Sequence, residues 1–178
     1  MEDGRWFAMG AVAAVTAAGL ARRGGRAAVA HSRMRPQTAK ARIEVFAYEG
    51  GTLGTGEGVS LSIPGVKDAY AEFVFFSPAD LQDYVQEYAV ESRIPERSTV
   101  ALLAGIVLPE GLRGRGVGSE MLRQGIETVF DQGVRAIYLV SLPEPKSLYD
   151  RFGFVEIEPI WLMNWSWMRL RKSDWVRR

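Results

Sequence analysis

TVALLAGIVL at residues 99–108 and PEGLRGRGVGS at residues 109–119 are the adjoining stretches that decide the fold of this chain. The first stretch is a short apolar run rich in branched residues, which is typical of a buried strand. After the glycines, apolar residues recur on one helix face until Gly133 gives a stop signal, at Val117, Met121, Leu122, Ile126, Val129 and Phe130. The pattern predicts a strand, a glycine turn and a helix over about 116–132.

The glycine turn indicates an anion site. The first turn of a helix has N–H groups without intrahelical partners and carries the positive end of the helix dipole. Glycines remove the side chains that would hold a phosphate away, and Arg113 and Arg115 add positive charge. The ligand expected at this turn is therefore a phosphorylated cofactor.

Two familiar phosphate-binding motifs do not fit the turn. A dinucleotide fingerprint that starts at Gly114 needs a third glycine where this chain has Ser119. A P-loop needs Lys and then Ser or Thr after its last glycine, whereas Gly116 is followed by Val117.

The pattern Arg113-x-x-Gly116-x-Gly118 resembles the acetyl-coenzyme A pyrophosphate loop of the GNAT acyltransferase superfamily. The resemblance continues through a strand predicted at 134–140 and the stretch SLYDRFGF at residues 147–154. That stretch is similar to the family's Leu-Tyr-x-x-x-Gly-Phe signature. Two signatures in the right order are more specific than either alone. The competing interpretation is a glycine turn that only connects a strand to a helix.

The resemblance implies an α/β (α+β) fold with a mixed, mostly antiparallel central sheet and helices on both faces. The sheet would be splayed between the strands near 99–108 and 134–141, and these two strands should be parallel. The implied cofactor is acetyl-CoA, and the implied reaction needs no metal. The implied cofactor contacts are Ile106, Val107 and Leu108 on the strand, and Arg113, Gly114, Arg115, Gly116, Val117, Gly118 and Ser119 in the loop.

The chemistry expected from the resemblance is acetyl transfer from a thioester to an amine. Such a transfer needs a deprotonated amine, a positioned carbonyl and a proton for the departing thiolate. Tyr149 matches the family's tyrosine, which acts as general acid; the alternative is an aromatic side chain packed between helix and sheet. The central strand holds no acid between Val100 and Leu108, so Glu72 and Glu96 are the candidate bases from neighbouring segments.

Two functional hypotheses follow. The first is an N-acetyltransferase that acts on the amine of a small molecule, a peptide or a protein. The second is a catalytically inactive GNAT-fold binding or structural subunit, docked through its N-terminal arm and its Trp-rich C-terminus. The intact loop and Tyr149 favour the first hypothesis, whereas the missing central-strand acid favours the second.

The N-terminal segment differs in composition from the rest of the chain. Residues 1–42 hold eight basic and two acidic side chains, a net charge of +6, and the whole chain carries +1, so the remainder carries −5. We interpret residues 1–40 as a basic, Ala-rich arm and residues 41–178 as the GNAT-like domain. The stretch from Trp6 to Ala21 is almost free of polar residues, but it is shorter than the ~20 residues of a usual membrane span.

Three interpretations of the arm stay open: a helix packed on the domain or a partner, a membrane anchor, and an organelle-targeting leader. Contact with a membrane or a protein complex through residues 5–35 belongs to the first two. A nucleic-acid partner is not expected, because the basic residues lack interleaved aromatics. We expect a cytoplasmic protein, with a membrane-associated or organellar location as the alternative. The absence of cysteine agrees with an intracellular location and excludes thiolate chemistry, and a lone histidine, His31, makes a histidine-based metal site improbable.

The remaining elements are predicted as strands at 42–48, 58–63 and 69–76 and a helix over 79–91 with Ser77 as its N-cap. A helix in that place departs from the family, whose usual order has two helices between the first and second strands. The departure leaves the acceptor in doubt. Four of the five tryptophans lie in the last 18 residues, as the buried face of a last strand or as an acceptor pocket or contact surface: Trp161, Trp165, Trp167 and Trp175.

Overall fold

The computed structural model describes residues 42–49, 54–86, 88–160 and 164–175. The predictions for residues 1–40 and for Trp161 lie outside these ranges. No helix in the described ranges is both long enough and apolar enough to cross a membrane.

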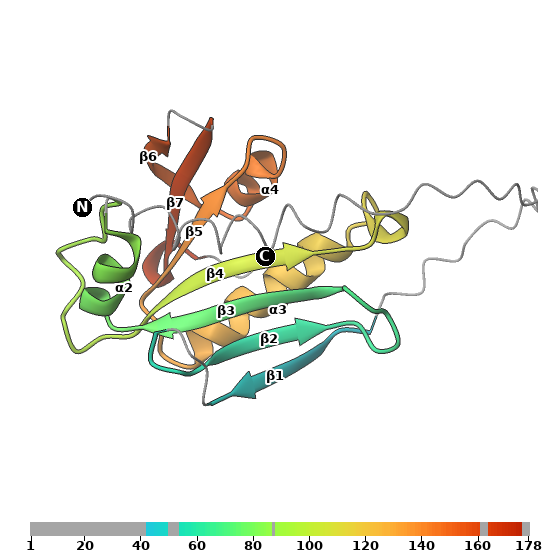
Figure 1. Cartoon of the computed structure of the whole chain (residues 1–178), viewed down its shortest axis with the longest axis horizontal. Helices are drawn as coiled ribbons and strands as arrows, with labels where there is room; N and C mark the ends of the chain where they lie inside the picture. The colour runs from blue at the N-terminus through green and yellow to red at the C-terminus, as the bar shows by residue number, and fades with distance from the viewer. Residues whose placement is uncertain (1–41, 50–53, 87, 161–163, 176–178) are drawn as a thin grey trace, which may run out of the picture. The chain divides into compact units, whose positions relative to one another are not determined.

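The centre of the domain is a mixed sheet of seven strands in the order β1-β2-β3-β4-β5-β7-β6, shown in Figure 1. The strands are β1 (Glu44–Tyr48), β2 (Gly58–Ser62), β3 (Tyr70–Phe76), β4 (Val100–Val107), β5 (Ala136–Ser141), β6 (Val155–Ile160) and β7 (Trp165–Arg171). Every neighbouring pair is antiparallel except β4 and β5, which are parallel. The predicted mostly antiparallel sheet is confirmed.

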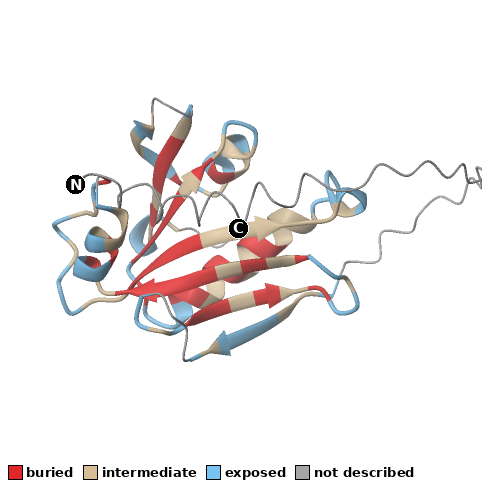
Figure 2. Cartoon of the chain, in the orientation of Figure 1, coloured by how far each residue is buried: buried red, intermediate tan, exposed pale blue. Residues whose placement is uncertain are grey.

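Helices cover both faces of this sheet. The helices are α2 (Pro78–Val85), α3 (Val117–Asp131) and α4 (Lys146–Arg151), with short 3₁₀ turns η2 (Glu110–Leu112) and η3 (Lys172–Asp174). In Figure 1, α3 lies behind β1–β4, whereas α2 lies at one end of the sheet. Figure 2 shows buried residues concentrated in the central strands and on the sheet-facing side of α3.

The contact of α3 with the sheet depends on Gly125. A Cβ at this position would overlap the Phe73 ring and lie 3.2 Å from Leu61 Cδ1. The helix therefore approaches β2 and β3 closely, and the buried side chains around Gly125 fill the space on either side, at Met121, Leu122, Ile126, Val129 and Phe130.

The opposite face has its own core cluster where α2 covers the sheet. Trp167 on β7 is fully buried there and stacks on Tyr138 of β5 at a centroid distance of 5.4 Å. Val74, Leu102 and Tyr88 belong to the same cluster. Trp167 is therefore a core residue, as expected for the buried face of a last strand. Trp175 stacks on Phe152, with centroids 6.2 Å apart.

The strands β4 and β5 separate partway along their length. Their paired residues are Ala101 with Ile137 and Leu102 with Tyr138. Just beyond them, the register between β3 and β4 shifts between Glu72 and Phe73, which leaves Ala104 as an extra residue on β4. Such a bulge bends its strand. The bend explains why β4 leaves β5, and the predicted splay is confirmed.

The helix predicted over 79–91 is shorter than expected, because α2 ends at Val85. Its predicted start is confirmed: Ser77 Oγ accepts a hydrogen bond from the Asp80 N–H at 3.1 Å. The helix stops where Gln86 takes a φ of +48°, and the Gln82 amide then donates to the carbonyls of Gln86 and Tyr88. The predicted C-terminal end of this helix is wrong, because the Gln82 side chain, and not a further helical turn, donates hydrogen bonds to these two carbonyls.

Replacing Gly125 by alanine tests the close approach of α3. The added methyl group would press on the buried Phe73 ring, and overpacking of this kind costs about 1–3 kcal/mol, partly offset by the ~1 kcal/mol better helix propensity of alanine. The added Cβ would lie only 2.3 Å from a Phe73 ring carbon, so we expect a cost of about 2–3 kcal/mol and a net loss of unfolding free energy of about 1–2 kcal/mol, measured by denaturant titration. The control is Gly111→Ala, because an added Cβ there meets nothing within 4 Å. Unchanged stability in Gly125→Ala would contradict the packing.

Candidate functional site

The loop between β4 and α3 forms a cradle of backbone N–H groups. Gly114 and Gly116 have φ values of +71° and +80°, in the left-handed region that glycine tolerates best. An added Cβ at either residue would meet nothing within 4 Å, so the space in front of the loop is open. The first helical hydrogen bond of α3 runs from Glu120 N–H to the Gly116 carbonyl at 3.0 Å. The N–H groups of residues 117–119 precede it and have no partner within the helix.

The charges around this cradle favour an anion. Arg113 and Arg115 are exposed beside the two glycines, and Arg113 Nε donates to the Leu108 carbonyl at 3.0 Å. The acid in the first turn of α3, Glu120, pairs with Arg123, whose Nη2 lies 2.6 Å from Glu120 Oε1, and Arg123 also pairs with Glu127. The positive end of the helix and the two exposed arginines therefore dominate the local field.

The end of β4 continues the wall of the cradle. Residues Ile106–Leu108 are half-buried and lie beyond the last residues that pair with β5. A Cβ at Gly118 would lie 3.2 Å from Leu108 Cδ1, so the start of α3 packs directly on the end of the strand. The structure thus brings all the residues predicted to bind a cofactor into one continuous surface at the splay.

Tyr149 lies on α4, directly after β5, the other strand of the splay. Its side chain is 8% exposed and contacts Phe154 edge-to-face at 5.8 Å. Burial raises the pKa of Tyr149 from 10.0 to about 12, so the phenol keeps its proton at neutral pH. Within the described ranges, the Tyr149 hydroxyl makes no hydrogen bond. The hydroxyl oxygen is not fully buried. The hydroxyl is therefore free to donate to a ligand.

The two candidate bases lie in different places. Glu72 is on β3, paired in register with Gly105 of β4 at the bulge. Its Oε1 accepts a hydrogen bond from Tyr48 at 3.3 Å. Glu96 is exposed in the segment before β4, at the end of that strand away from the glycine loop. Glu72 is therefore the carboxylate near the splay, and Glu96 is not.

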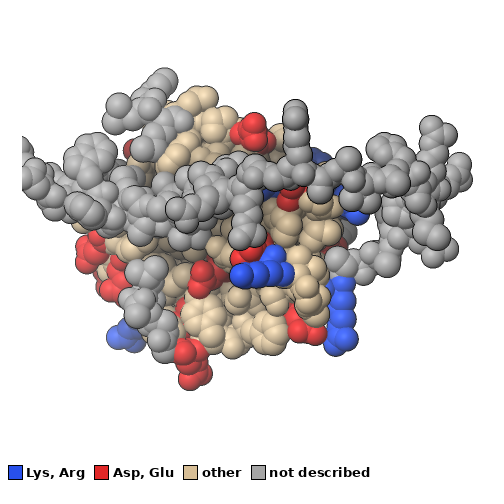
Figure 3. All heavy atoms as spheres, turned by 45° about the vertical axis from the view of Figure 1, so that its right-hand side comes forward, with Lys and Arg blue, Asp and Glu red and all other residues tan. Residues whose placement is uncertain are grey.

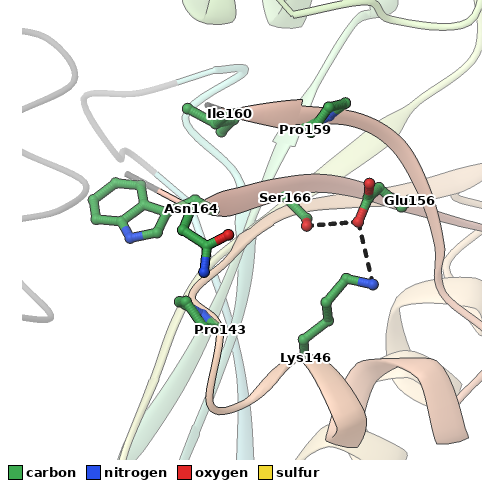
Figure 4. Close-up of a pocket in the computed structure, with 8 residues that line it drawn as sticks. Pro143, Lys146, Glu156, Pro159, Ile160, Asn164 and Ser166 are labelled. Atoms are coloured by element: carbon green, nitrogen blue, oxygen red, sulfur yellow. Dashed lines mark hydrogen bonds and ion pairs between the residues drawn. The ribbon is translucent and has the colours of Figure 1, made fainter. Parts of the chain in front are cut away.

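A pocket of about 270 Å³ lies at the β6–β7 hairpin, where Pro143 follows β5 (Figure 4). One wall is polar: Glu156 Oε2 accepts from Ser166 Oγ at 2.7 Å and pairs with Lys146 Nζ at 3.2 Å. The Ser166 hydroxyl, and then Lys146, hold the pKa of Glu156 below its ordinary value. Apart from Trp165, which the tryptophan pattern singled out, sequence reasoning missed this pocket, because no motif joins its residues.

Charged side chains on the face shown in Figure 3 are interspersed with uncharged residues. The described residues on that face form no continuous basic surface.

The family of the chain follows from comparison with known proteins. Residues 60–154 match the model of the acetyltransferase (GNAT) family, and this range includes the splay, the glycine loop and Tyr149. The chain belongs to the GNAT acetyltransferase family. No curated protein matches it.

Solved structures show that the GNAT fold is shared despite low identity. Arabidopsis thaliana NAA60 in complex with acetyl-CoA is 13% identical, with a TM-score of 0.52 over 74% of this chain and 99% of that chain. A bacterial toxin is 15% identical, with a TM-score of 0.52 over 75% of this chain and 92% of that chain. In this fold the glycine loop follows β4 and the stretch with Tyr149 follows β5. The two sequence signatures therefore lie after the two strands that form the splay.

The burial of Tyr149 predicts a specific pH dependence of stability. The folded protein binds the phenolic proton more tightly than the unfolded chain, with a pKa of about 12 against 10.0. This contribution to stability is complete below pH 10 and is lost as the pH rises toward 12. Over that range the unfolding free energy of Tyr149→Phe should fall less steeply than that of the wild type, measured by denaturant titration at several pH values. Parallel curves for the two proteins would show that the phenol is not buried.

Proposed function

We propose that this GNAT protein is an acetyl-CoA-dependent N-acyltransferase that moves an acetyl group to an amine by direct attack on the thioester. The observation that carries the proposal is the splay of β4 from β5 where it meets the glycine loop at the start of α3. This arrangement offers unpaired strand backbone and an anion cradle on one continuous surface. The complex of Arabidopsis thaliana NAA60 with acetyl-CoA supports the choice of cofactor.

The residues of the site fit this cofactor. The N–H groups of residues 117–119, with Arg113 and Arg115, would hold the pyrophosphate. The backbone of residues 106–108 would pair with the amides of the pantetheine arm, since β5 does not pair with it. Bound acetyl-CoA would supply an activated acetyl thioester. Tyr149 holds a proton at neutral pH and would donate it to the departing sulfur.

The acceptor is an amine of a small molecule, a peptide or a protein. The second hypothesis, a GNAT-fold binding subunit without catalysis, predicts no turnover, with cofactor binding either retained or lost. The two experiments below separate the hypotheses.

The glycine loop is tested by calorimetric titration of acetyl-CoA into the intact chain and two variants. Gly116→Trp should weaken binding by about a hundredfold or more, because a side chain in the cradle displaces hydrogen bonds to a charged group worth ~1.5–3 kcal/mol each. Gly65→Trp is the matched control. Gly65 also has a positive φ, +75°, and open space around an added Cβ, but it lies in the β2–β3 turn. If the intact chain does not bind acetyl-CoA, the proposal is wrong and the binding-subunit hypothesis is favoured.

Tyr149 is tested by the rate of thiol release from acetyl-CoA in the presence of a panel of primary amines. Tyr149→Phe keeps the ring but removes the proton donor. We expect kcat to fall by about 10²-fold or more while acetyl-CoA affinity changes little. Tyr84→Phe, which alters a half-buried phenol beside Phe76, is the control for a general loss of packing. An unchanged kcat in Tyr149→Phe would remove Tyr149 from the mechanism.

A further inference from the structure

Trp175, the last residue that the structure describes, contacts the ends of two helices. Its ring stacks on Phe152, the residue that caps α4, with centroids 6.2 Å apart and ring planes 8° apart. The same indole lies against Phe130 in the last turn of α3, with centroids 6.5 Å apart and planes at 51°. Aromatic pairs at such separations attract each other beyond their area of contact. Trp175 therefore joins the C-terminal ends of α3 and α4.

The two joined helices carry different parts of the candidate site. The first turn of α3 belongs to the anion cradle, and α4 carries Tyr149. The position of the phenol relative to a cofactor in the cradle therefore depends on how α4 is held against α3 and the sheet.

The helix α4 is too short to fix its own position. It has six residues, fewer than an isolated helix needs to be stable in water. Its N-cap is Pro145, whose side chain cannot bond to the first turn. Lys146 pairs with Glu156 at 3.2 Å, but both side chains are more than a third exposed, and exposed ion pairs contribute little. The position of α4 therefore depends mainly on the contacts of its C-terminal half.

The turn after Tyr149 couples its backbone to Phe152. The Tyr149 carbonyl accepts hydrogen bonds from the N–H groups of Phe152 at 3.0 Å and Phe154 at 3.2 Å. Gly153, between the two phenylalanines, takes a φ of +87°, which glycine adopts without strain. The Tyr149 ring in turn packs edge-to-face on the Phe154 ring. A displacement of Phe152 would therefore displace Tyr149.

The segment that carries Trp175 is itself fixed to α3. The Trp175 N–H donates to the Lys172 carbonyl at 3.3 Å, and Lys172 Nζ donates to the Phe130 carbonyl at the end of α3. The indole Nε1 is buried and has no hydrogen-bond partner among the described residues. An unpaired buried donor is costly, so the apolar contacts of the ring must outweigh that cost. The stack on Phe152 therefore holds α4 to a segment that is anchored on α3.

We propose that Trp175 is a positioning residue for the acyl transfer, which holds α4 against α3 so that the Tyr149 hydroxyl lies within reach of the thioester sulfur. The inference rests on the proposed acyltransferase function and goes beyond it, because Trp175 acts through Phe152 and not on the reacting atoms. A misplacement of about 1 Å can cost about a hundredfold in rate. Loss of the stack should therefore lower turnover and spare the cradle, which lies at the other end of α3.

The thiol-release assay separates positioning from cofactor binding. Trp175→Ala should lower kcat by about tenfold to a hundredfold and leave the KM for acetyl-CoA within a few-fold. Trp175→Phe, which keeps a ring against Phe152, should restore most of kcat. Phe46→Ala removes a half-exposed ring from the edge strand β1 and is the control with wild-type kcat. Wild-type kcat in Trp175→Ala would overturn the proposal.

A double-mutant cycle with Tyr149→Phe shows whether Trp175 acts through the phenol. Residues that act as a unit have effects that do not add. In the Tyr149→Phe background, Trp175→Ala should change kcat by no more than about twofold. Equal losses in the two backgrounds would mean that Trp175 only stabilises the fold, and the proposal would be wrong.

Phe152→Leu tests the same contact from the other side and covers the case in which Trp175→Ala does not fold. Leucine keeps much of the apolar volume but removes the stacked ring, and Trp175 still contacts Phe130. The expected loss of kcat and its absence in the Tyr149→Phe background are the same as for Trp175→Ala. A Phe152→Leu protein with wild-type kcat would contradict the proposal.

Amide hydrogen exchange tests the anchoring of α4 without any turnover. In Trp175→Ala, the Phe154 N–H, which donates to the Tyr149 carbonyl, should exchange about tenfold faster or more. The Glu120 N–H, which donates to the Gly116 carbonyl at the cradle, should exchange as in the wild type. Equal acceleration of both amides, or no change in either, would overturn the proposal.

The two proposals fail in distinguishable ways. Loss of acetyl-CoA binding by the wild-type chain contradicts the acyltransferase function, whereas hydrogen exchange still decides whether Trp175 anchors α4. A reduced kcat in Tyr149→Phe together with wild-type kcat in Trp175→Ala contradicts only the positioning role.

Discussion

The end of pairing between β4 and β5 at Leu102 and Tyr138 is the constraint on which the rest of the structure depends. Strands that stop pairing partway leave backbone groups without partners, and such groups are costly unless water or a ligand satisfies them. The fold limits this cost to the facing edges of the two strands. On its other side, β4 pairs with β3 along its length apart from the bulged Ala104, and β5 pairs with β7 along its whole length. The splay is therefore held open by a sheet that is complete on both flanks.

Hydrogen bonds and ion pairs fix the closed end of the splay. The Trp167 indole N–H donates to the Ala89 carbonyl at 3.0 Å, and the Glu91 N–H donates to the Tyr138 hydroxyl at 3.1 Å. The Glu91 carboxylate pairs with Arg169 and Arg171 on β7. The segment after α2 is thus tied to β5 and to β7, the other neighbour of β5. These contacts hold the end of the splay where the two strands still pair, at the opposite end of β4 from the glycine loop.

The sequence predicted the elements whose signals are local. The strand before the glycine loop and the helix after it follow from periodicity and glycine spacing over adjacent residues, and both formed as predicted. The end of α2 could not be predicted from local sequence. It depends on the Gln82 side-chain oxygen, which accepts a hydrogen bond from the Val90 N–H at 2.9 Å, and on the pairing of Glu91 with arginines some 80 residues away. The sequence identified Glu72 as a candidate base. Its position near the splay could not be predicted, because that position depends on the register of β3 against β4.

The position of α2 links the closed end to the uncovered face. In the described residues no helix lies between β1 and β2, and α2 follows β3 instead. The helix therefore adds its apolar side chains to the cluster around Trp167, and it covers the face that carries Glu72 only at that end. This placement puts buried apolar contacts beside the junction where β4 and β5 still pair. In the described residues it leaves the bulged part of β4, at the open end of the splay, without a helix on that face.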